Sequence, residues 1–434
     1  MGFSQSLGNL ERHRRMVEKM KKISFFSVML FCLVTPFIMN YRLSPGETPY
    51  WLFGIIFLFL FLSSLSEVFS FSEKIKDILV WALILLVLGS GYFSAILVRH
   101  RVAPVYQTHD IILQLEGAVH FFLRGKNPYA TTYFGTPLEL WHYSDTEVNP
   151  ALYHFVMMPW YLLFSLPFYF ISVSFLGWWD GRMPLLFLFF FTLFLIWRLM
   201  KNYPEKRRIF LVLFSFNPAT LGYFLEGRSD IFMYAFLFWG FYLLFAKKLS
   251  LAGIPLALAL ATKQSAWPIF PLYLAFLWVK AGRNFQNMIK IILPFLVTSF
   301  LVIGPFFIWD PKAFLESTIF YLSGNVSHSY PISGYGWGMV LRQLGIISNP
   351  HQNYPFWIWQ LIFCLPLLIF LIRGLLKNPT VKNLIFSYGV FTFVFWYFSR
   401  YFNNSHLGYL SIVFLTAYFW PEEKRKLFLR KVKN

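Results

Sequence analysis

Twelve long apolar runs, each bounded by charged residues, glycine, proline or asparagine, constrain this chain of 434 residues more than any other feature. A membrane-spanning helix needs roughly 20 consecutive apolar residues, so the hydrophobic residues here are enough for about twelve spans. Hydrophobic residues make up 57% of the chain and charged residues only 13%. A soluble domain carries about 25% charged residues. The sequence therefore excludes a soluble globular protein and a disordered one.

We predict an all-α, polytopic transmembrane helical bundle that forms a single integral-membrane domain over residues 1–434. The predicted spans follow the apolar runs at 24–40, 51–70, 78–98, 183–200, 208–225, 229–246, 250–262, 264–280, 289–309, 355–376, 384–398 and 407–420. The two cysteines, Cys32 and Cys364, both lie in apolar runs. They indicate neither a disulfide framework nor a cysteine-based zinc site.

The formal net charge of +19 is explained by membrane orientation. If the N-terminus lies inside, most of the 38 Lys and Arg residues fall in the tails and the inner loops, as the positive-inside rule requires. Nucleic-acid binding would need a basic, polar domain, and the sequence contains none. We predict a multi-pass protein of a bacterial-type plasma membrane, with both termini in the cytoplasm.

One further apolar stretch, residues 151–176, does not fit this topology as a span, because a single crossing would place the basic loop KNYPEKRR outside. The stretch contains Pro159 and Pro167, which interrupt helices. We therefore expect a re-entrant or interfacial segment.

The outer face then has two long loops, 99–182 and 310–354, and every histidine except His13 lies on that face. Long loops are often functional, so the chemistry is expected at the outer face.

The first outer loop contains a segment, 110–124, with the periodicity of an amphipathic helix. We expect this helix to lie flat at the membrane interface on its apolar face. Asp110 begins the helix and lies on its polar side, with Gln114 nearby. Gln114 and the preceding His109 are candidate substrate-binding residues. The Asp110 carboxylate could cap the helix or, held rigidly and ionised, act as a general base.

The same loop continues with SDTEVNPALYH, which supplies Asn149 and His154 as candidate substrate-binding residues. Asp145 and Glu147 could bind a metal through oxygen ligands. A solvated acidic loop is the favoured interpretation, so we expect no metal site.

Charged residues also interrupt the apolar runs further along the chain. The turn at 226–230 holds Glu226, Arg228 and Asp230, which could form a functional site or a self-neutralising cluster that caps the next helix. Lys263 marks a second outer turn. This lysine could hold a lipid phosphate, or it could extend its amine to the membrane surface.

Three more candidates lie near the C-terminus and in the second outer loop. Arg400 is a candidate for gripping a phosphate with two hydrogen bonds, and His406 follows it in the same outer turn. His328 lies among tyrosines and tryptophans that could stack on sugar rings or form an ordinary aromatic belt. Nucleotide-binding loops and zinc-binding motifs are absent from the sequence.

The order of several short motifs resembles the GT-C superfamily of polytopic membrane glycosyltransferases, most closely the polyprenyl-phosphate-mannose-dependent mannosyltransferases. The motifs lie within residues 85–280. They are the acid Asp110, the amphipathic helix, GKNPY, NPALY, a later Asn-Pro pair, the G-x-x-D turn and the segment AGIPLALALATK. Two of them depart from the family pattern: Asn149-Pro150-Ala151 replaces Tyr-Pro-Pro or Asn-Pro-Pro, and Gly227-Arg228-Ser229-Asp230 replaces Gly-His-Asp or Gly-Gln-Asn.

The resemblance implies an inverting transferase that moves a hexose, such as mannose, from a polyprenyl phosphate to a hydroxyl of a lipid or glycan acceptor. It implies that Asp110 is the general base, and that no cofactor is needed. Arg400, with Lys263 or Arg228, would stabilise the departing phosphate. Two other hypotheses remain: a transporter or flippase for lipid-linked oligosaccharides, and an O-antigen ligase or polymerase with a diphosphate-linked donor.

Overall fold

The computed structural model describes residues 25–39, 49–69, 71–142 and 147–423. The N-terminal tail, most of the C-terminal tail and Asp145 lie outside the described residues. The structure is 74% helical with almost no strands, which confirms the all-α prediction.

Helices occupy all twelve of the predicted apolar runs, although not all of them are long enough to cross a membrane. Among the described residues, five helices are sufficiently long and apolar, or six if the bent pair Pro204–Ser215 and Pro218–Glu226 forms one span. Four further apolar helices are shorter. These helices are compatible with a multi-pass membrane protein, and the count of twelve spans stays a prediction.

The smaller of two compact units comprises residues 1–107 and 200–225. Its described helices are α2 (Phe25–Met39), α3 (Tyr50–Val68), α4 (Glu73–Ile84), α5 (Ser90–Val102), α9 (Pro204–Ser215) and most of α10 (Pro218–Glu226); a π-helical segment, η1 (Leu85–Gly89), joins α4 to α5. Arg208 of α9 donates to Glu73 of α4 at 2.6 Å, and Arg207 pairs with Asp77 of α4. These ion pairs attach the returning segment to the N-terminal helices.

The larger unit comprises residues 108–199 and 226–434. Its α-helices are α6 (Asp110–Leu123), α7 (Pro159–Leu176), α8 (Met183–Leu199), α11 (Asp230–Phe245), α12 (Leu249–Leu260), α13 (Ile269–Lys280), α14 (Phe285–Trp309), α15 (Pro311–Leu315), α16 (Tyr321–Ser323), α17 (Trp337–Gln343), α18 (Phe356–Lys377), α19 (Val381–Tyr397) and α20 (Asn404–Phe419). Shorter segments are η2 (Pro137–Leu140), η3 (Pro150–Leu152), η4 (Gln264–Ala266), η5 (Glu316–Phe320), and the strands β1 (Ser333–Gly334) and β2 (Tyr401–Phe402), which pair in parallel. The sequence predicted one integral-membrane domain, and the structure describes two compact units within it.

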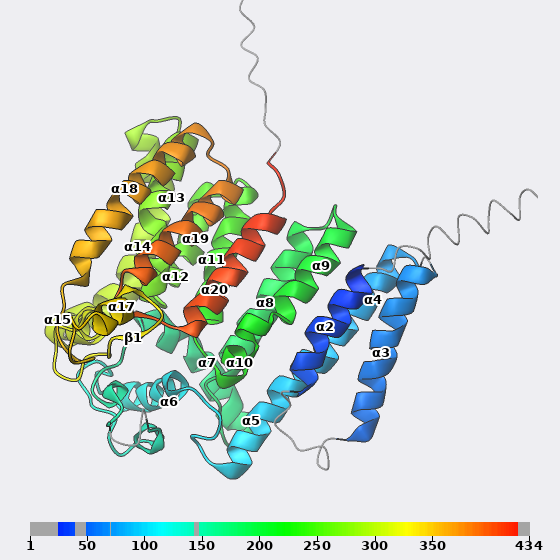
Figure 1. Ribbon diagram of the computed structural model, residues 1–434, viewed down its shortest axis with the longest axis horizontal. Helices are drawn as coiled ribbons and strands as arrows, with labels where there is room; N and C mark the ends of the chain where they lie inside the picture. Colours follow the sequence, from blue (N-terminus) through cyan, green and yellow to red (C-terminus); the bar gives the residue numbers. More distant parts are fainter. Residues whose placement is uncertain (1–24, 40–48, 70, 143–146, 424–434) are drawn as a thin grey trace, which may run out of the picture. The chain divides into compact units, whose positions relative to one another are not determined.

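Helix α6 runs across one end of the larger unit's long helices instead of alongside them (Figure 1). The helix begins at Asp110, as predicted. Its apolar side chains, including Ile112, Leu115 and Val119, are fully buried within the protein. The expectation that this apolar face lies against the membrane interface is therefore wrong, because the face packs on protein.

Helix α7 is continuous from Pro159 to Leu176, with Pro167 in its interior. Pro159 occupies the first turn, where a missing N–H costs nothing. Pro159 thus separates α7 from the segment before it, as predicted, but the prediction that Pro167 interrupts the helix is wrong. Helix α7 is one of the five helices long and apolar enough to span a membrane.

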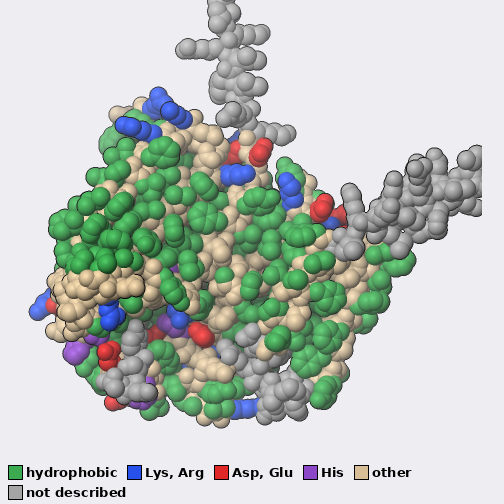
Figure 2. Space-filling model, viewed as in Figure 1, with side chains coloured by type: hydrophobic (Ala, Val, Ile, Leu, Met, Phe, Trp, Pro, Cys, Tyr) green, Lys and Arg blue, Asp and Glu red, His purple; other side chains and the backbone are tan. Residues whose placement is uncertain are grey.

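Hydrophobic side chains cover much of the long helices of the larger unit in the view of Figure 2. Phe300 and Leu301 of α14 and Phe370 of α18 are more than 60% exposed. Histidine side chains are visible at the end of this unit where α6 and β1 lie. The long helices thus present apolar surface, and groups capable of chemistry gather at one end.

Candidate functional site

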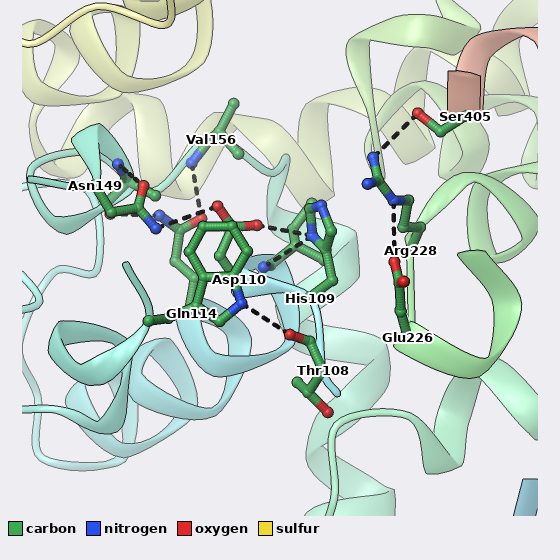
Figure 3. Close-up of polar contacts among 12 residues, drawn as sticks. Thr108, His109, Asp110, Gln114, Asn149, Val156, Glu226, Arg228 and Ser405 are labelled. Atoms are coloured by element: carbon green, nitrogen blue, oxygen red, sulfur yellow. Dashed lines mark hydrogen bonds and ion pairs between the residues drawn. The ribbon is translucent and has the colours of Figure 1, made fainter. Parts of the chain in front are cut away.

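Asp110 is the first residue of α6, and its carboxylate lies between two side chains from different segments (Figure 3). His109 Nδ1 is 2.7 Å from Asp110 Oδ1, and Asn149 Nδ2 donates to Asp110 Oδ2 at 3.3 Å. The N-cap residue of α6 is His109. Asp110 therefore does not serve as the helix cap, one of the two roles that the sequence allowed.

The charge state of Asp110 follows from opposing effects. Burial raises the pKa of this carboxyl group, whereas the electrostatic interaction and hydrogen bond with His109, the hydrogen bond of Asn149 and the charge of Arg228 lower it. The lowering effects prevail, so the pKa lies below its ordinary value of 3.8. Asp110 is ionised at neutral pH, although its side chain is only 16% exposed.

The orientation of Asn149 is set by the start of η3. Asn149 Oδ1 accepts a hydrogen bond from Ala151 N at 2.9 Å, and Pro150 occupies the first position of the helical turn. The amide nitrogen is thereby turned toward Asp110. The segment Asn-Pro-Ala thus holds a hydrogen-bond donor against the carboxylate.

Gln114 lies one helical turn after Asp110 and is buried. Its Nε2 donates to Ala151 O at 2.7 Å and to His154 O at 2.6 Å, and its Oε1 accepts from Val156 N at 3.4 Å. The side chain fastens the segment 149–156 to α6. This role replaces the substrate-binding role expected from the sequence, because the amide groups are already engaged.

The turn at 226–230 packs directly on the start of α6. His109 N donates to Glu226 O at 2.9 Å. Gly227 has φ +91°, and a Cβ placed there would lie 2.5 Å from Ile112 and 2.7 Å from Arg182. Only glycine fits this conformation and this space without strain.

This turn brings a group of charged residues close to Asp110. Arg228 Nη1 donates to Ser405 Oγ at 3.2 Å, and Arg228 Nε is 3.7 Å from Glu226 Oε2. Lys263 Nζ is 2.6 Å from Asp230 Oδ1. The charge of Arg228 acts on Asp110. Arg228 thus links the two groups, because its charge acts both on Asp110 and on Asp230, the partner of Lys263.

His406 lies beside this charged group, and the charges of Asp230, Lys263 and Arg228 act on its ring. Its Nδ1 accepts a hydrogen bond from Asn403 N at 2.9 Å, which forms part of a capping box at the start of α20. The imidazole is buried. His406 therefore has a structural capping role at the edge of the site.

His154 and His328 connect the two outer loops. His154 Nε2 donates to Ser327 O at 3.3 Å, and the ring of His328 stacks on Tyr153 with centroids 3.8 Å apart and planes 5° apart. Burial lowers the pKa of His154, so this imidazole is neutral at neutral pH. The two histidines hold the loops together, a role that the sequence did not indicate.

Arg400 does not have the role that the sequence suggested. Its guanidinium donates to Gln352 O at 2.9 Å, to Pro350 O at 3.1 Å and to Tyr330 O. The residue is 2% exposed, and burial lowers its pKa to about 10, so the charge remains at neutral pH. We correct the interpretation of Arg400 as a phosphate ligand, because backbone carbonyls already surround its guanidinium.

Sequence reasoning missed a buried ion pair below the site. Arg182 Nε and Nη2 donate to the two carboxylate oxygens of Asp180 at 2.9 and 2.7 Å, and Gly181 N donates to Glu116 of α6 at 2.9 Å. Arg182 is fully buried and packs beneath Gly227. The sequence signal was the charged triplet Asp-Gly-Arg between two apolar runs.

Among the described residues, no group of three or more His, Cys, Asp and Glu side chains is placed to hold a metal ion. Comparisons of the chain with family models, curated proteins and solved structures find no match.

Proposed function

We propose that this protein is a membrane glycosyltransferase. It moves a hexose, such as mannose, from a polyprenyl-phosphate donor to a hydroxyl group of a lipid or glycan acceptor, at the outer face of the membrane. The proposal joins the order of motifs in the sequence to the charged groups around Asp110.

One observation carries the proposal most strongly: the charge of Arg228 acts on the ionised carboxylate at the start of α6, and Lys263 pairs with Asp230 of the same turn as Arg228. Arg228 lies on the turn that packs on the start of α6, and Lys263 pairs with Asp230 of that turn. A transfer from a phosphate donor needs both kinds of group, a base for the acceptor and positive charge for the departing phosphate.

The proposed reaction is a single displacement. The acceptor oxygen attacks the anomeric carbon as its proton passes to the pair formed by His109 and Asp110. The bond from that carbon to the phosphate oxygen breaks. The electron pair leaves with the polyprenyl phosphate, whose charge Lys263 and Arg228 stabilise. Attack from the side opposite the phosphate inverts the anomeric configuration.

Sugar transfer by the purified protein tests this function directly. The donor is labelled polyprenyl-phospho-mannose, and a membrane lipid extract provides the acceptors. The wild-type protein is compared with Asp110→Asn and with Glu147→Gln, an exposed acid of the same loop that lies 3.3 Å from the exposed His351. We expect transfer by the wild type and E147Q, and a loss of about 10²–10⁴-fold in D110N.

Two outcomes would contradict the proposal. Equal transfer by D110N would remove Asp110 from the chemistry. An absence of transfer by the wild type, together with movement of lipid-linked sugars across liposome membranes that D110N retains, would identify a transporter. A matched pair, Lys263→Met and the exposed Lys312→Met, separates the phosphate-stabilising charge from general surface charge.

A further inference from the structure

His109 is the side chain closest to Asp110, and its protonation can be deduced from its contacts. Its Nδ1 is 2.7 Å from Asp110 Oδ1 and 3.3 Å from Ile111 N. These contacts make opposite demands: the carboxylate oxygen needs a proton on Nδ1, whereas the backbone N–H needs a lone pair there. The carboxylate contact is much the shorter, and two lone pairs at 2.7 Å would repel each other. The proton therefore lies on Nδ1.

With the proton on Nδ1, the neutral imidazole carries its lone pair on Nε2, at the opposite side of the ring. The described residues supply no hydrogen-bond partner for Nε2, and the side chain is 20% exposed. Both oxygens of Asp110, by contrast, already accept hydrogen bonds, one from His109 and one from Asn149. The more available proton acceptor of the pair is therefore His109.

The backbone and the neighbouring ring fix His109 in place. His109 N donates to Glu226 O at 2.9 Å, and the imidazole lies 6.2 Å from the ring of Trp141, whose Nε1 donates to Thr108 O at 2.9 Å. In Figure 3, His109 lies between Asp110 and the pair formed by Glu226 and Arg228. The ring thus lies between the carboxylate and the turn that carries Arg228.

We infer that His109 Nε2 accepts the proton of the attacking hydroxyl, and that Asp110 holds the imidazole in the required tautomer and stabilises the imidazolium that forms. This inference rests on the proposed function. The acceptor O–H bond breaks toward Nε2, the new bond forms to the anomeric carbon, and the phosphate leaves with its electron pair. The imidazolium later gives its proton to water. A carboxylate that orients a histidine base is a known arrangement in other enzyme classes.

Two substitutions of His109 separate proton acceptance from positioning. In His109→Asn, the amide nitrogen can replace Nδ1 as donor to Asp110, and asparagine is a favourable N-cap, but nothing replaces Nε2. In His109→Ala, both nitrogens are lost and a space remains that free imidazole can enter. His120→Ala is the control, since His120 is an exposed histidine on the last turn of the same helix.

The transfer assay described above is repeated with these variants, with and without added imidazole. We expect His109→Asn and His109→Ala to lose about 10²–10⁴-fold in rate. Imidazole should restore part of the rate of His109→Ala and none of that of His109→Asn, and His120→Ala should match the wild type. A His109→Asn variant as active as the wild type would overturn the inference and leave His109 a positioning residue.

A second measurement is independent of turnover. Nitrogen NMR of histidine-labelled protein at neutral pH reports which ring nitrogen carries the proton, and the His109 signals are those missing from His109→Asn. The expected signals are those of a neutral ring protonated at Nδ1. An imidazolium, or a proton on Nε2, would overturn the inference even if the wild type transferred no sugar. If the NMR signals show the expected tautomer but the wild type transfers no sugar, then the proposed function fails and the assignment of the His109 proton stands.

Discussion

An asparagine side chain that hydrogen-bonds at both ends has only one orientation available, and Asn149 is in that situation. Its oxygen accepts from Ala151 N and its nitrogen donates to Asp110. The same sequence, Asn-Pro-Ala, recurs at 217–219, where Asn217 Oδ1 accepts from Ala219 N at 3.0 Å. The shared cap makes Asn217 a matched control for the role of Asn149 at the carboxylate.

Replacing Asn149 with aspartate should reduce transfer and shift its pH dependence. The new carboxylate can still cap η3, but its second oxygen would face Asp110 at about the present 3.3 Å. Two like charges at this distance raise the pKa of one group. The pair then holds a proton up to a higher pH, so the loss of rate on acidification should begin at higher pH than in the wild type. We also expect at least about a tenfold loss at neutral pH, because the hydrogen bond that Asn149 donates to the Asp110 carboxylate is lost.

Rates measured from pH 4 to pH 9 check this expectation. Asn217→Asp should leave the profile of the wild type unchanged, since it alters the same kind of cap in the smaller unit. An unaltered profile in Asn149→Asp would show that Asn149 acts only as a cap.

At the scale of elements, the site depends on the packing of the turn at 226–230 against helix α6. The turn at 226–230 touches α6 through Gly227, and the buried pair of Asp180 and Arg182 lies beneath both. Packing at Gly227 therefore helps to set the position of Arg228 and Asp230 relative to Asp110.

Gly227→Ala should destabilise the protein and slow transfer together. Both Gly227 and Gly125 have positive φ, +91° and +72°, but a Cβ on Gly125 would meet nothing within 4 Å. Alanine at either position incurs backbone strain of about 1 kcal/mol. At 227, overpacking against Ile112 and Arg182 adds about 1–3 kcal/mol. Thermal unfolding and transfer rates of the two variants measure the difference, and equal effects would contradict the packing role of Gly227.

The helices could be predicted from the sequence, whereas their surroundings could not. The period of apolar residues located α6 and its start at Asp110, but the same pattern suits a helix on a membrane surface or one buried in protein. Gln114 shows why local sequence does not predict such contacts. Its three hydrogen bonds join segments about 40 residues apart, and no local pattern encodes them. Pro167 misled the prediction, since neighbouring packing allows proline within an apolar helix.

At the scale of the whole molecule, orientation in the membrane follows from charge. The sequence places the site's residues in the two long loops and in the shorter turns predicted to lie outside, and the structure brings residues of both long loops together within the larger unit. His154 of the first loop contacts Ser327 of the second. The side of the membrane on which they lie remains a prediction from the distribution of lysine and arginine.

Cysteine labelling tests this orientation. In a background with Cys32→Ala and Cys364→Ala, single cysteines replace the exposed Lys126, before α7, and the exposed Lys201, after α8. We expect an impermeant maleimide to label Lys126→Cys in intact cells and Lys201→Cys only after permeabilisation, because the basic loop at 201 favours the cytoplasm. Labelling of both from outside would mean that α7 crosses the membrane as well as α8.

The guanidinium of Arg400 has a consequence for how the second outer loop is assembled. One planar group binds three carbonyls of that loop, at Tyr330, Pro350 and Gln352, and so joins positions about 20 residues apart to the start of β2. Secreted proteins usually cross-link such loops with disulfides, yet both cysteines here are free. A cross-link made of hydrogen bonds forms as the chain folds, requires no oxidant and resists thiol reagents. The loop should therefore keep its shape whatever the redox conditions on its side of the membrane.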